Sequence, residues 1–114
     1  MFKKENRLST NFEFNITKKY GTKLFSRYFT LYYLKPNKYQ GPSKIGIVVS
    51  TKLHKKAVKR NWIKRIFRET IRQKLDKIPS DLWIAIYPKR ICLEKTYEEI
   101  STDINKVLPK ISLS

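Results

Sequence analysis

The fold of this chain is decided by the stretch Ala57-Val-Lys-Arg-Asn-Trp-Ile-Lys-Arg-Ile-Phe-Arg-Glu69. At about 100° per residue, its apolar side chains fall on one side of a helix and its polar side chains on the other. The pattern predicts a helix from about Lys55 to Lys77 that packs on a core with one side and presents cations with the other. The apolar side holds Ile63, Ile66, Phe67 and Thr70, and the polar side holds Asn61, Lys64, Arg65, Arg68 and Arg72.

The charge of this helix points to an anionic partner. Between Lys52 and Lys77 the chain carries eleven Lys or Arg residues and two acidic ones. Like charges one turn apart repel by a few tenths of a kcal/mol per pair, so a helix that needed only solubility would mix the signs. The alternative to a binding surface is a basic face that is merely solvated. The net charge of +17 extends the argument to the whole molecule. We expect strong, salt-dependent binding to nucleic acid first, and to an anionic membrane surface second.

Length and composition limit the remaining possibilities. The 114 residues suffice for one domain, spanning 1–114, and 40% hydrophobic residues with 13% aromatic ones favour a folded protein over a basic tail. Cys92 is the only cysteine, which excludes an internal disulfide or a cysteine-rich zinc site, and we expect it to be a small half-buried filler. No apolar run approaches a membrane span and Met1-Phe-Lys-Lys-Glu5 lacks a signal-peptide core, so we expect a soluble cytoplasmic protein without a membrane partner.

The residues before the basic helix predict one helix and two strands. Thr10 and Glu13 have the spacing of a capping box, and Gly21 is a helix terminator. Gly46 lies where a side chain would block the approach of a neighbouring element or a ligand. The predicted parts are a flexible basic segment over 1–9, a helix over 11–20, a strand over 27–34, a hairpin loop over 35–42 and a returning strand over 44–50.

The residues after the basic helix predict a strand and a last helix. The apolar run 82–87 has the composition of a central strand, and Pro88 ends it. Thr96 and Glu99 form a second capping box ahead of a helix that is broken near Pro109. The elements follow the order α-β-β-α-β-α, in which a further strand can precede the basic helix. This order predicts an α+β fold, a two-layer α-β sandwich with helices on a mostly antiparallel sheet.

Groups that could catalyse a reaction are few. His54 is the only histidine and has no carboxylate near it in sequence. The best-clustered acids are Glu94, Glu98, Glu99 and Asp103, at a helix start where the helix dipole already favours acid. There is no phosphate-binding glycine loop and no metal-ligand spacing. We therefore expect no catalytic residue and no firm metal site in this chain.

Groups that could bind RNA are plentiful. Arginine forks hold phosphates bidentately, and the basic helix supplies Arg60, Arg65, Arg68 and Arg72. Asn61 can reach a base edge or a ribose hydroxyl, and Lys56 and Lys59 add charge. Aromatic residues of the first helix and strand exceed what a small core needs, so one face of that strand can offer rings for stacking bases. They are Phe12, Phe14, Tyr28, Phe29, Tyr32 and Tyr33.

At these residues the chain resembles the protein subunit of bacterial ribonuclease P. The hallmark of that family is Ala-Val-x-Arg-Asn-Arg-Ile-Lys-Arg-x-x-Arg-Glu, which residues 57–69 match with Trp62 in place of the second arginine. The resemblance extends to Gly46-Ile-Val-Val-Ser-Thr-Lys52 and to Asn6-Arg-Leu8. It continues through Glu13-Phe14, Gly21-Thr22 and the aromatic pattern Arg27-x-Phe29-x-x-x-Tyr33, in the family's order.

The resemblance implies a sandwich with a left-handed βαβ crossover through the basic helix. It implies a non-catalytic protein, monomeric alone, whose partner is a large RNA that removes the 5′ leader of precursor tRNA with bound Mg²⁺. The residues facing that RNA would be Arg60, Asn61, Lys64, Arg65 and Arg68. A separate cleft for the leader would be lined by Phe14 and Tyr32, with Lys52 at its edge. Phe12 is the alternative to Phe14, and Lys18 stands where a second cleft aromatic is common.

Other functions remain open at this stage. A structural RNA-binding protein, such as a ribosomal component, would share the charge but need no leader cleft. A duplex-DNA reader would place a helix in the major groove, but the basic helix lacks a second helix just before it. A free-standing nuclease would need catalytic groups that the chain lacks.

Overall fold

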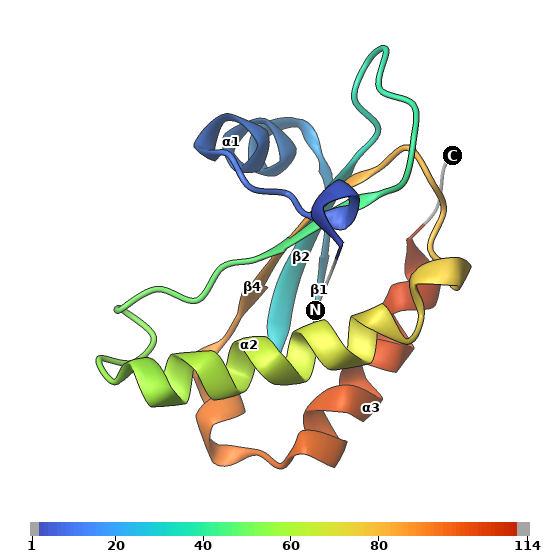
Figure 1. The fold of residues 1–114 in the computed structure, drawn as a ribbon. Coiled ribbons are helices and arrows are strands. Elements are labelled where there is room, and N and C mark those ends of the chain that lie inside the picture. The colour runs from blue at the N-terminus through green and yellow to red at the C-terminus, as the bar shows by residue number, and fades with distance from the viewer. Residues whose placement is uncertain (1–2, 112–114) are drawn as a thin grey trace.

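The computed structural model describes residues 3–111, which form a four-stranded sheet and three α-helices (Figure 1). The helices are α1 (Asn11–Tyr20), α2 (Ala57–Arg72) and α3 (Tyr97–Val107). The strands are β1 (Thr22–Phe25), β2 (Phe29–Leu34), β3 (Lys44–Ile47) and β4 (Trp83–Pro88). Short 3₁₀ turns lie at Lys4–Asn6, Leu75–Lys77, Arg90–Glu94 and Leu108–Lys110.

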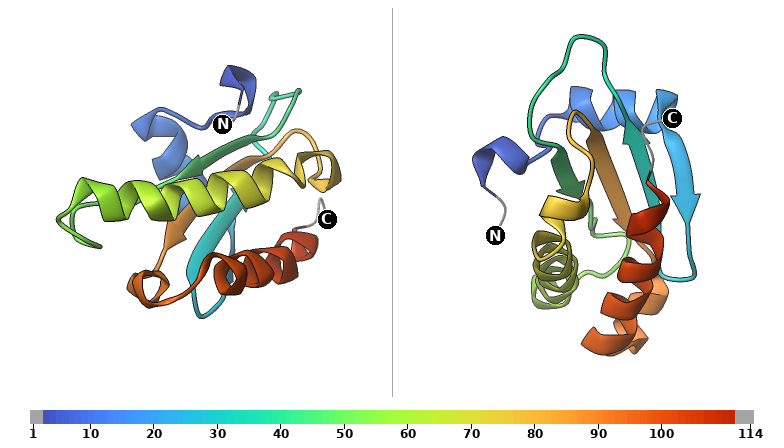
Figure 2. Two further views of the ribbon diagram at one scale, coloured as in Figure 1. Left: turned by 60° about the horizontal axis from the view of Figure 1, so that its bottom comes forward. Right: turned by 90° about the vertical axis from the view of Figure 1, so that its right-hand side faces the viewer.

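The sheet has the strand order β1-β2-β4-β3 and is antiparallel except between β4 and β3. The helix α2 joins this parallel pair, which makes β3-α2-β4 the βαβ unit that the resemblance implies. Figure 2 shows α2 and α3 side by side on one face of the sheet, where Thr70 Oγ1 donates to Ser101 Oγ at 3.2 Å. The helix α1 lies over the other face. The predicted α+β fold with a mostly antiparallel sheet is confirmed.

The core fills the space between the sheet and the helices α2 and α3. Phe29 of β2 meets Phe67 of α2 edge-to-face, with ring centroids 5.4 Å apart. The whole apolar side predicted for the basic helix is buried, as the helical spacing requires. Strand alternation sends Phe29 and Leu31 into this core and Tyr32 to the opposite face. The remaining large core residues are Ile45, Ile63, Ile66, Ile71, Leu82, Ile84, Ile86, Ile100 and Ile104.

The predicted hairpin between strands 27–34 and 44–50 is wrong. The strand β4 lies between β2 and β3, so Tyr33 pairs with Ile84, and Ile84 pairs on its other side with Ile45. The reason is burial: the apolar run of β4 is covered on both faces and takes a central place in the sheet. The strand β2 forms its hairpin with β1 instead, from Thr22 opposite Tyr33 to Phe25 opposite Thr30.

The segment before α1 differs from the flexible one predicted over 1–9. Arg7 forms a parallel bridge with Ile45. The N–H of Leu8 donates to Ile45 O at 3.1 Å, and Asn6 Nδ2 donates to Ser43 O at 3.2 Å. Leu8 is only 4% exposed. Burying this leucine fixes residues 6–8 along the outer edge of β3; residues 1–2 lie outside the described part of the chain.

Capping groups set the start of two of the three α-helices. Both predicted capping boxes are present, at Thr10 with Glu13 and at Thr96 with Glu99. The helix α2 is shorter than the predicted range 55–77, because it begins after Lys56 and gives way to the 3₁₀ turn Leu75–Lys77. Pro109 lies in the 3₁₀ turn that follows α3.

Candidate nucleic-acid interface

The outer side of α2 carries the predicted binding residues, and we call it the basic face. Its side chains are exposed or half-buried, whereas Ile63 and Phe67 on the opposite side are fully buried. One helix therefore anchors the core and presents cations along its whole length. The basic face comprises Lys56, Lys59, Arg60, Asn61, Lys64, Arg65, Arg68 and Arg72.

The basic face is hardly neutralised by the protein's own acids. Of the three ion pairs within residues 3–111, only the one between Arg65 Nε and Glu69 Oε1, at 3.1 Å, touches it. An exposed pair of this kind contributes roughly 0–1 kcal/mol and exchanges readily. The two other pairs join Lys44 to Glu13 and Lys95 to Glu99. The positive potential of α2 is thus open to an external polyanion.

Arg60 differs from the other arginines because it folds back on its own chain. Its Nη1 donates to His54 O at 2.9 Å and to Lys55 O at 2.8 Å. Arg60 therefore fixes the loop that leads into α2, where the Lys56 N–H donates to His54 Nδ1 at 3.0 Å. A hollow of about 540 Å³ in this loop is lined by Lys52, Lys55, Lys56, His54 and Arg90, among others.

The opposite face of the sheet carries aromatic rings and a cation. Tyr32 and Tyr87 meet edge-to-face with centroids 5.7 Å apart, and Lys18 Nζ lies 5.3 Å from the centroid of the Tyr87 ring. Burial raises the pKa of the Tyr87 hydroxyl, and Tyr32 raises it further. Tyr87 was not singled out from the sequence, although period-2 alternation along 82–87 places it on this face. Lysine over an aromatic ring suits a surface that meets both phosphates and bases.

The structure separates Phe12 from Phe14. Phe12 is 68% exposed on the outer side of α1, because the neighbouring Glu13 faces the protein. Phe14 packs on the bare backbone of Gly46, so the close approach at this glycine is made by a neighbouring element. Phe14, Tyr32 and Lys18 thus belong to the α1 side of the sheet. Lys52 lies in the loop before α2 and lines a different hollow.

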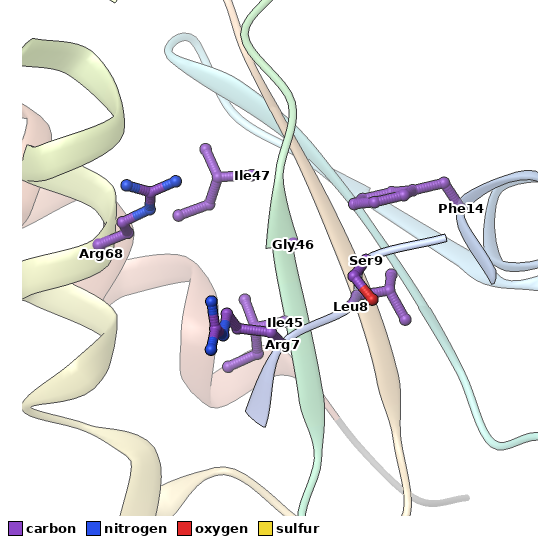
Figure 3. Close-up of a pocket in the computed structure, with 8 residues that line it drawn as sticks. All are labelled: Arg7, Leu8, Ser9, Phe14, Ile45, Gly46, Ile47 and Arg68. Carbon is purple, nitrogen blue, oxygen red and sulfur yellow. The ribbon is translucent and has the colours of Figure 1, made fainter. Parts of the chain in front are cut away.

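Arg7 is a candidate binding residue that the sequence analysis missed. Together with Phe14 and Arg68 it lines a hollow of about 280 Å³ at the edge of β3 (Figure 3). The signal available in the sequence was its place within Asn6-Arg-Leu8. A segment predicted to be flexible offers no fixed geometry, so the sequence alone does not place Arg7 beside other binding residues.

Trp62 lies at the boundary between α2 and α3. It is 37% exposed and shares a hollow of about 140 Å³ with Tyr97, Arg65, Ile66 and Glu69. The position that carries arginine in the family hallmark therefore holds a partly packed ring at the edge of the apolar side, as its place on the helix predicts.

The remaining reactive groups are used structurally. Cys92 is fully buried, and burial raises the pKa of its thiol to about 11, so it is a packed filler without a thiolate near neutral pH. Asp103 accepts a hydrogen bond from Ser26 Oγ, and Glu99 caps α3. Within residues 3–111, no three His, Cys, Asp or Glu side chains come together to hold a metal ion. Among residues 3–111, none of the helices has the length and apolar character that a membrane-spanning helix needs.

Comparisons with known proteins agree over nearly the whole chain. The family model for ribonuclease P matches residues 2–112. The ribonuclease P protein component of Bacillus mycoides is 36% identical over 108 residues, which cover 95% of this chain and 92% of that protein. That of Bacillus cereus is 35% identical over 109 residues, with the same shares covered.

Solved structures of ribonuclease P proteins have the same fold. A Staphylococcus aureus ribonuclease P protein, a mutant with defective mRNA degradation activity, superimposes with a TM-score of 0.83 and 30% identity, over 91% of this chain and 86% of that chain. The Thermotoga maritima protein in complex with 1-(4-fluorophenyl)-2-thiourea superimposes with a TM-score of 0.82 and 29% identity, over 93% of this chain and 100% of that chain.

Proposed function

The chain belongs to the ribonuclease P protein family, and from this premise we propose that its basic face docks on the catalytic RNA of ribonuclease P. The observation that carries the proposal is the near absence of acidic partners along α2 within residues 3–111. Guanidinium and ammonium groups that the protein does not neutralise itself attract phosphates and release their counterions. Arg60 shapes the loop beside the proposed contacts. These contacts are Lys56, Lys59, Asn61, Lys64, Arg65, Arg68 and Arg72.

The aromatic surface on the other side of the sheet is proposed to bind the 5′ leader of precursor tRNA. Tyr32 and Tyr87 offer ring surface for unpaired bases, and Lys18 of α1 lies over the Tyr87 ring. Phe14 of α1 lies on the same side of the sheet, against Gly46 of β3. A leader held here would tighten binding of the precursor, and removal of the leader would release the product. Phe12 is not part of this surface, since its ring faces solvent on the outer side of α1. Lys52 would meet the RNA separately, from its own loop.

The bond-breaking step is assigned to the RNA partner. Mg²⁺ would supply charge stabilisation and an activated water for hydrolysis of the phosphodiester. The described residues of this chain do not fit a Mg²⁺ site, because their carboxylates are dispersed over capping and ion-pair roles. The protein's part is to screen repulsion between two polyanions, which lowers the Mg²⁺ concentration that the assembly needs. The monomeric state and the cytoplasmic location remain predictions.

Cleavage of precursor tRNA by bare ribonuclease P RNA, with and without the protein, tests this proposal. At low Mg²⁺ the protein should restore 5′-leader removal, and the restored activity should prefer leader-bearing substrate over mature tRNA. Equal activity with and without protein would refute the proposal. Activation without any preference for the leader would favour a structural RNA-binding protein. Cleavage by purified protein alone would revive the free-standing nuclease.

A further inference from the structure

Two arginines from distant parts of the chain share the hollow at the edge of β3. Arg7 comes from the segment before α1, and Arg68 comes from the basic face of α2. Figure 3 shows both guanidinium groups turned into the space between α2 and β3, with Phe14 at the other end of the hollow. The hollow therefore connects the basic face to the aromatic side of the sheet around a strand edge.

These two cations have no acidic counterpart in the described structure. Neither takes part in the three ion pairs found within residues 3–111. The residues one turn from Arg68 along α2 are Lys64 and Arg72, which add to the positive charge. Two like charges facing one space repel each other, and an anion between them replaces that repulsion with two attractions. Charge alone makes this hollow a place for an anionic group.

The strand edge adds a neutral donor. The N–H groups of Lys44 and Val48 donate to β4, at 2.9 Å to Leu82 O and 2.8 Å to Ile86 O. In a parallel pair the next residues point the other way, so the N–H of Ile47 faces the outer edge and the hollow. On that edge Ile45 O already accepts from the Leu8 N–H. Ile47 has no backbone partner there among residues 3–111.

We propose that this hollow binds one backbone phosphate of an RNA strand, held by Arg7, Arg68 and the Ile47 N–H. Arginine forks match phosphate oxygens bidentately, and backbone N–H groups are common phosphate donors. An RNA strand is the ligand chemistry that suits the surroundings, because the basic face continues on one side and the Phe14 ring lies on the other. The site rests on the proposed function and extends it, since one strand crossing the β3 edge contacts both RNA-binding surfaces.

The strand belongs either to the catalytic RNA or to the precursor, and two binding measurements separate these sources. The first is the affinity of the protein for ribonuclease P RNA. The second is the affinity of the reconstituted assembly for precursor tRNA. Each uses the full chain with Arg7→Gln, Arg68→Gln and both together. Arg72→Gln, alone and with Arg7→Gln, is the matched control, because Arg72 is an exposed arginine one turn along α2 that does not line the hollow.

In one of the two measurements, Arg7→Gln and Arg68→Gln should each weaken binding about tenfold, the value of a charge-assisted hydrogen bond. The double variant should lose far less than the product of the two effects, because both groups hold the same phosphate. The control double variant, Arg7→Gln with Arg72→Gln, should instead weaken binding by the full product of its two single effects. Unchanged thermal unfolding midpoints would confirm that the variants fold.

The phosphate site is overturned if Arg7→Gln changes neither affinity, or if the Arg7 and Arg68 effects multiply within about twofold, as independent sites do. Cleavage at low Mg²⁺ by the unmodified protein keeps the two proposals apart. If that protein restores cleavage while the Arg7 and Arg68 effects multiply, only the phosphate site fails. If it does not restore cleavage, the proposed function fails whatever the variants do.

Discussion

Gly46 of β3 lies where the strand meets α1 and the segment before α1, and this close packing leaves no room for a side chain. A Cβ at this position would lie 2.5 Å from Phe14 Cε1 and 3.0 Å from Leu8 O. The strand β3, the helix α1 and the segment before it can therefore approach one another only at glycine. The same contact places Phe14 at the end of the hollow that holds Arg7.

Gly46→Ala should destabilise the protein by about 1–3 kcal/mol, because the added methyl group overpacks this contact. The measurement is the free energy of unfolding from a urea titration. Phe14→Ala in the same chain is the matched partner: the double variant should recover part of the Gly46→Ala loss, since the ring that meets the methyl group is gone. Additive losses would show that the strain lies in the backbone of β3 instead.

Trp62→Arg should strengthen binding to ribonuclease P RNA and steepen its salt dependence by about one phosphate contact. The substitution restores the arginine of the family hallmark at a site that is already partly exposed. Filter binding at several salt concentrations gives the slope, and Trp62→Gln is the control that removes the ring without adding charge. If Trp62→Gln binds more weakly than the unsubstituted protein, the ring itself contacts the RNA. If Trp62→Arg binds no more tightly than Trp62→Gln, the added charge does not reach a phosphate and the prediction is wrong.

At the scale of elements, the start of α2 lacks a side-chain cap. Lys56 occupies the N-cap position in an extended conformation, and the first turn contains no acidic residue. Both other helices have complete capping boxes. The helix proposed to bind RNA thus keeps its dipole and its first N–H groups open to an anion, at the expense of its own stability.

Lys56→Ser should stabilise the protein by about 0.5–2 kcal/mol and weaken RNA binding. A serine hydroxyl in this conformation can accept from the N–H of Val58 or Lys59, and one cation is lost. Unfolding in urea and binding to the catalytic RNA measure the two effects. Lys55→Ser removes the same charge one residue earlier and should change binding without raising stability. Equal stability of the two variants would contradict the capping argument.

The capping box of α1 should make stability depend on pH. Burial raises the pKa of the Glu13 carboxyl, but hydrogen bonds from the Thr10 and Ser9 N–H groups, from Thr10 Oγ1 and the charge of Lys44 together hold it below its ordinary value of 4.5. A carboxyl with a depressed pKa in the folded state stabilises the protein above its ordinary pKa. That contribution is lost as the pH falls from 4.5 through the folded-state pKa.

Glu13→Gln should flatten the loss of stability between neutral pH and about pH 3. Thermal unfolding midpoints across this range measure it. Some slope should remain, because the pKa of Glu99 in the second capping box is also lowered, chiefly by its hydrogen bonds to Thr96. Glu98→Gln is the control, since this exposed glutamate lies outside both boxes. A slope that is unchanged by Glu13→Gln would contradict the assignment.

The sequence predicted those elements whose signals are local. The helix α1 follows from its capping box and α2 from 3.6-residue spacing, and α3 follows from both. The strand β4 follows from its apolar run. The strand β1 was missed because it has only four residues and three of them are exposed, so no alternation marks it. The wrong hairpin has another cause. Nothing near residues 35–42 records that β4, much later in the chain, inserts between β2 and β3.

At the scale of the whole molecule, the net charge of +17 affects folding and binding in opposite directions. Raising the salt concentration from 50 to 200 mM should raise the thermal unfolding midpoint of the free protein, because self-repulsion is screened. Over the same range RNA binding should weaken about 10³-fold or more if six or more phosphates are contacted. Arg65→Ala should flatten the binding slope by about one contact. An unfolding midpoint that falls with salt would contradict this prediction.

The candidate site also shows what a single sequence can predict. The place of the basic face on the outer side of α2 could be predicted from the sequence, since all its members but Lys56 lie on one helix, and five of them share one helical spacing. Tyr87 and Arg7 were not predicted, because their roles depend on which strands become neighbours. Lys52, predicted at the edge of the leader cleft, lies in another hollow for the same reason. Surfaces within one element can be derived from periodicity, whereas surfaces that join elements require the sheet order.

The insertion of β4 between β2 and β3 also bears on synthesis of the protein. Leu34 of β2 pairs with Trp83 of β4, 49 residues later in the chain. A growing chain can therefore form only the β1–β2 part of the sheet until residue 88 has left the ribosome. Pairings so distant along the chain form slowly, and unpaired strand edges promote aggregation. Truncated products that end before β4 should therefore be insoluble, and the newly made protein should complete its sheet only after β4 has left the ribosome.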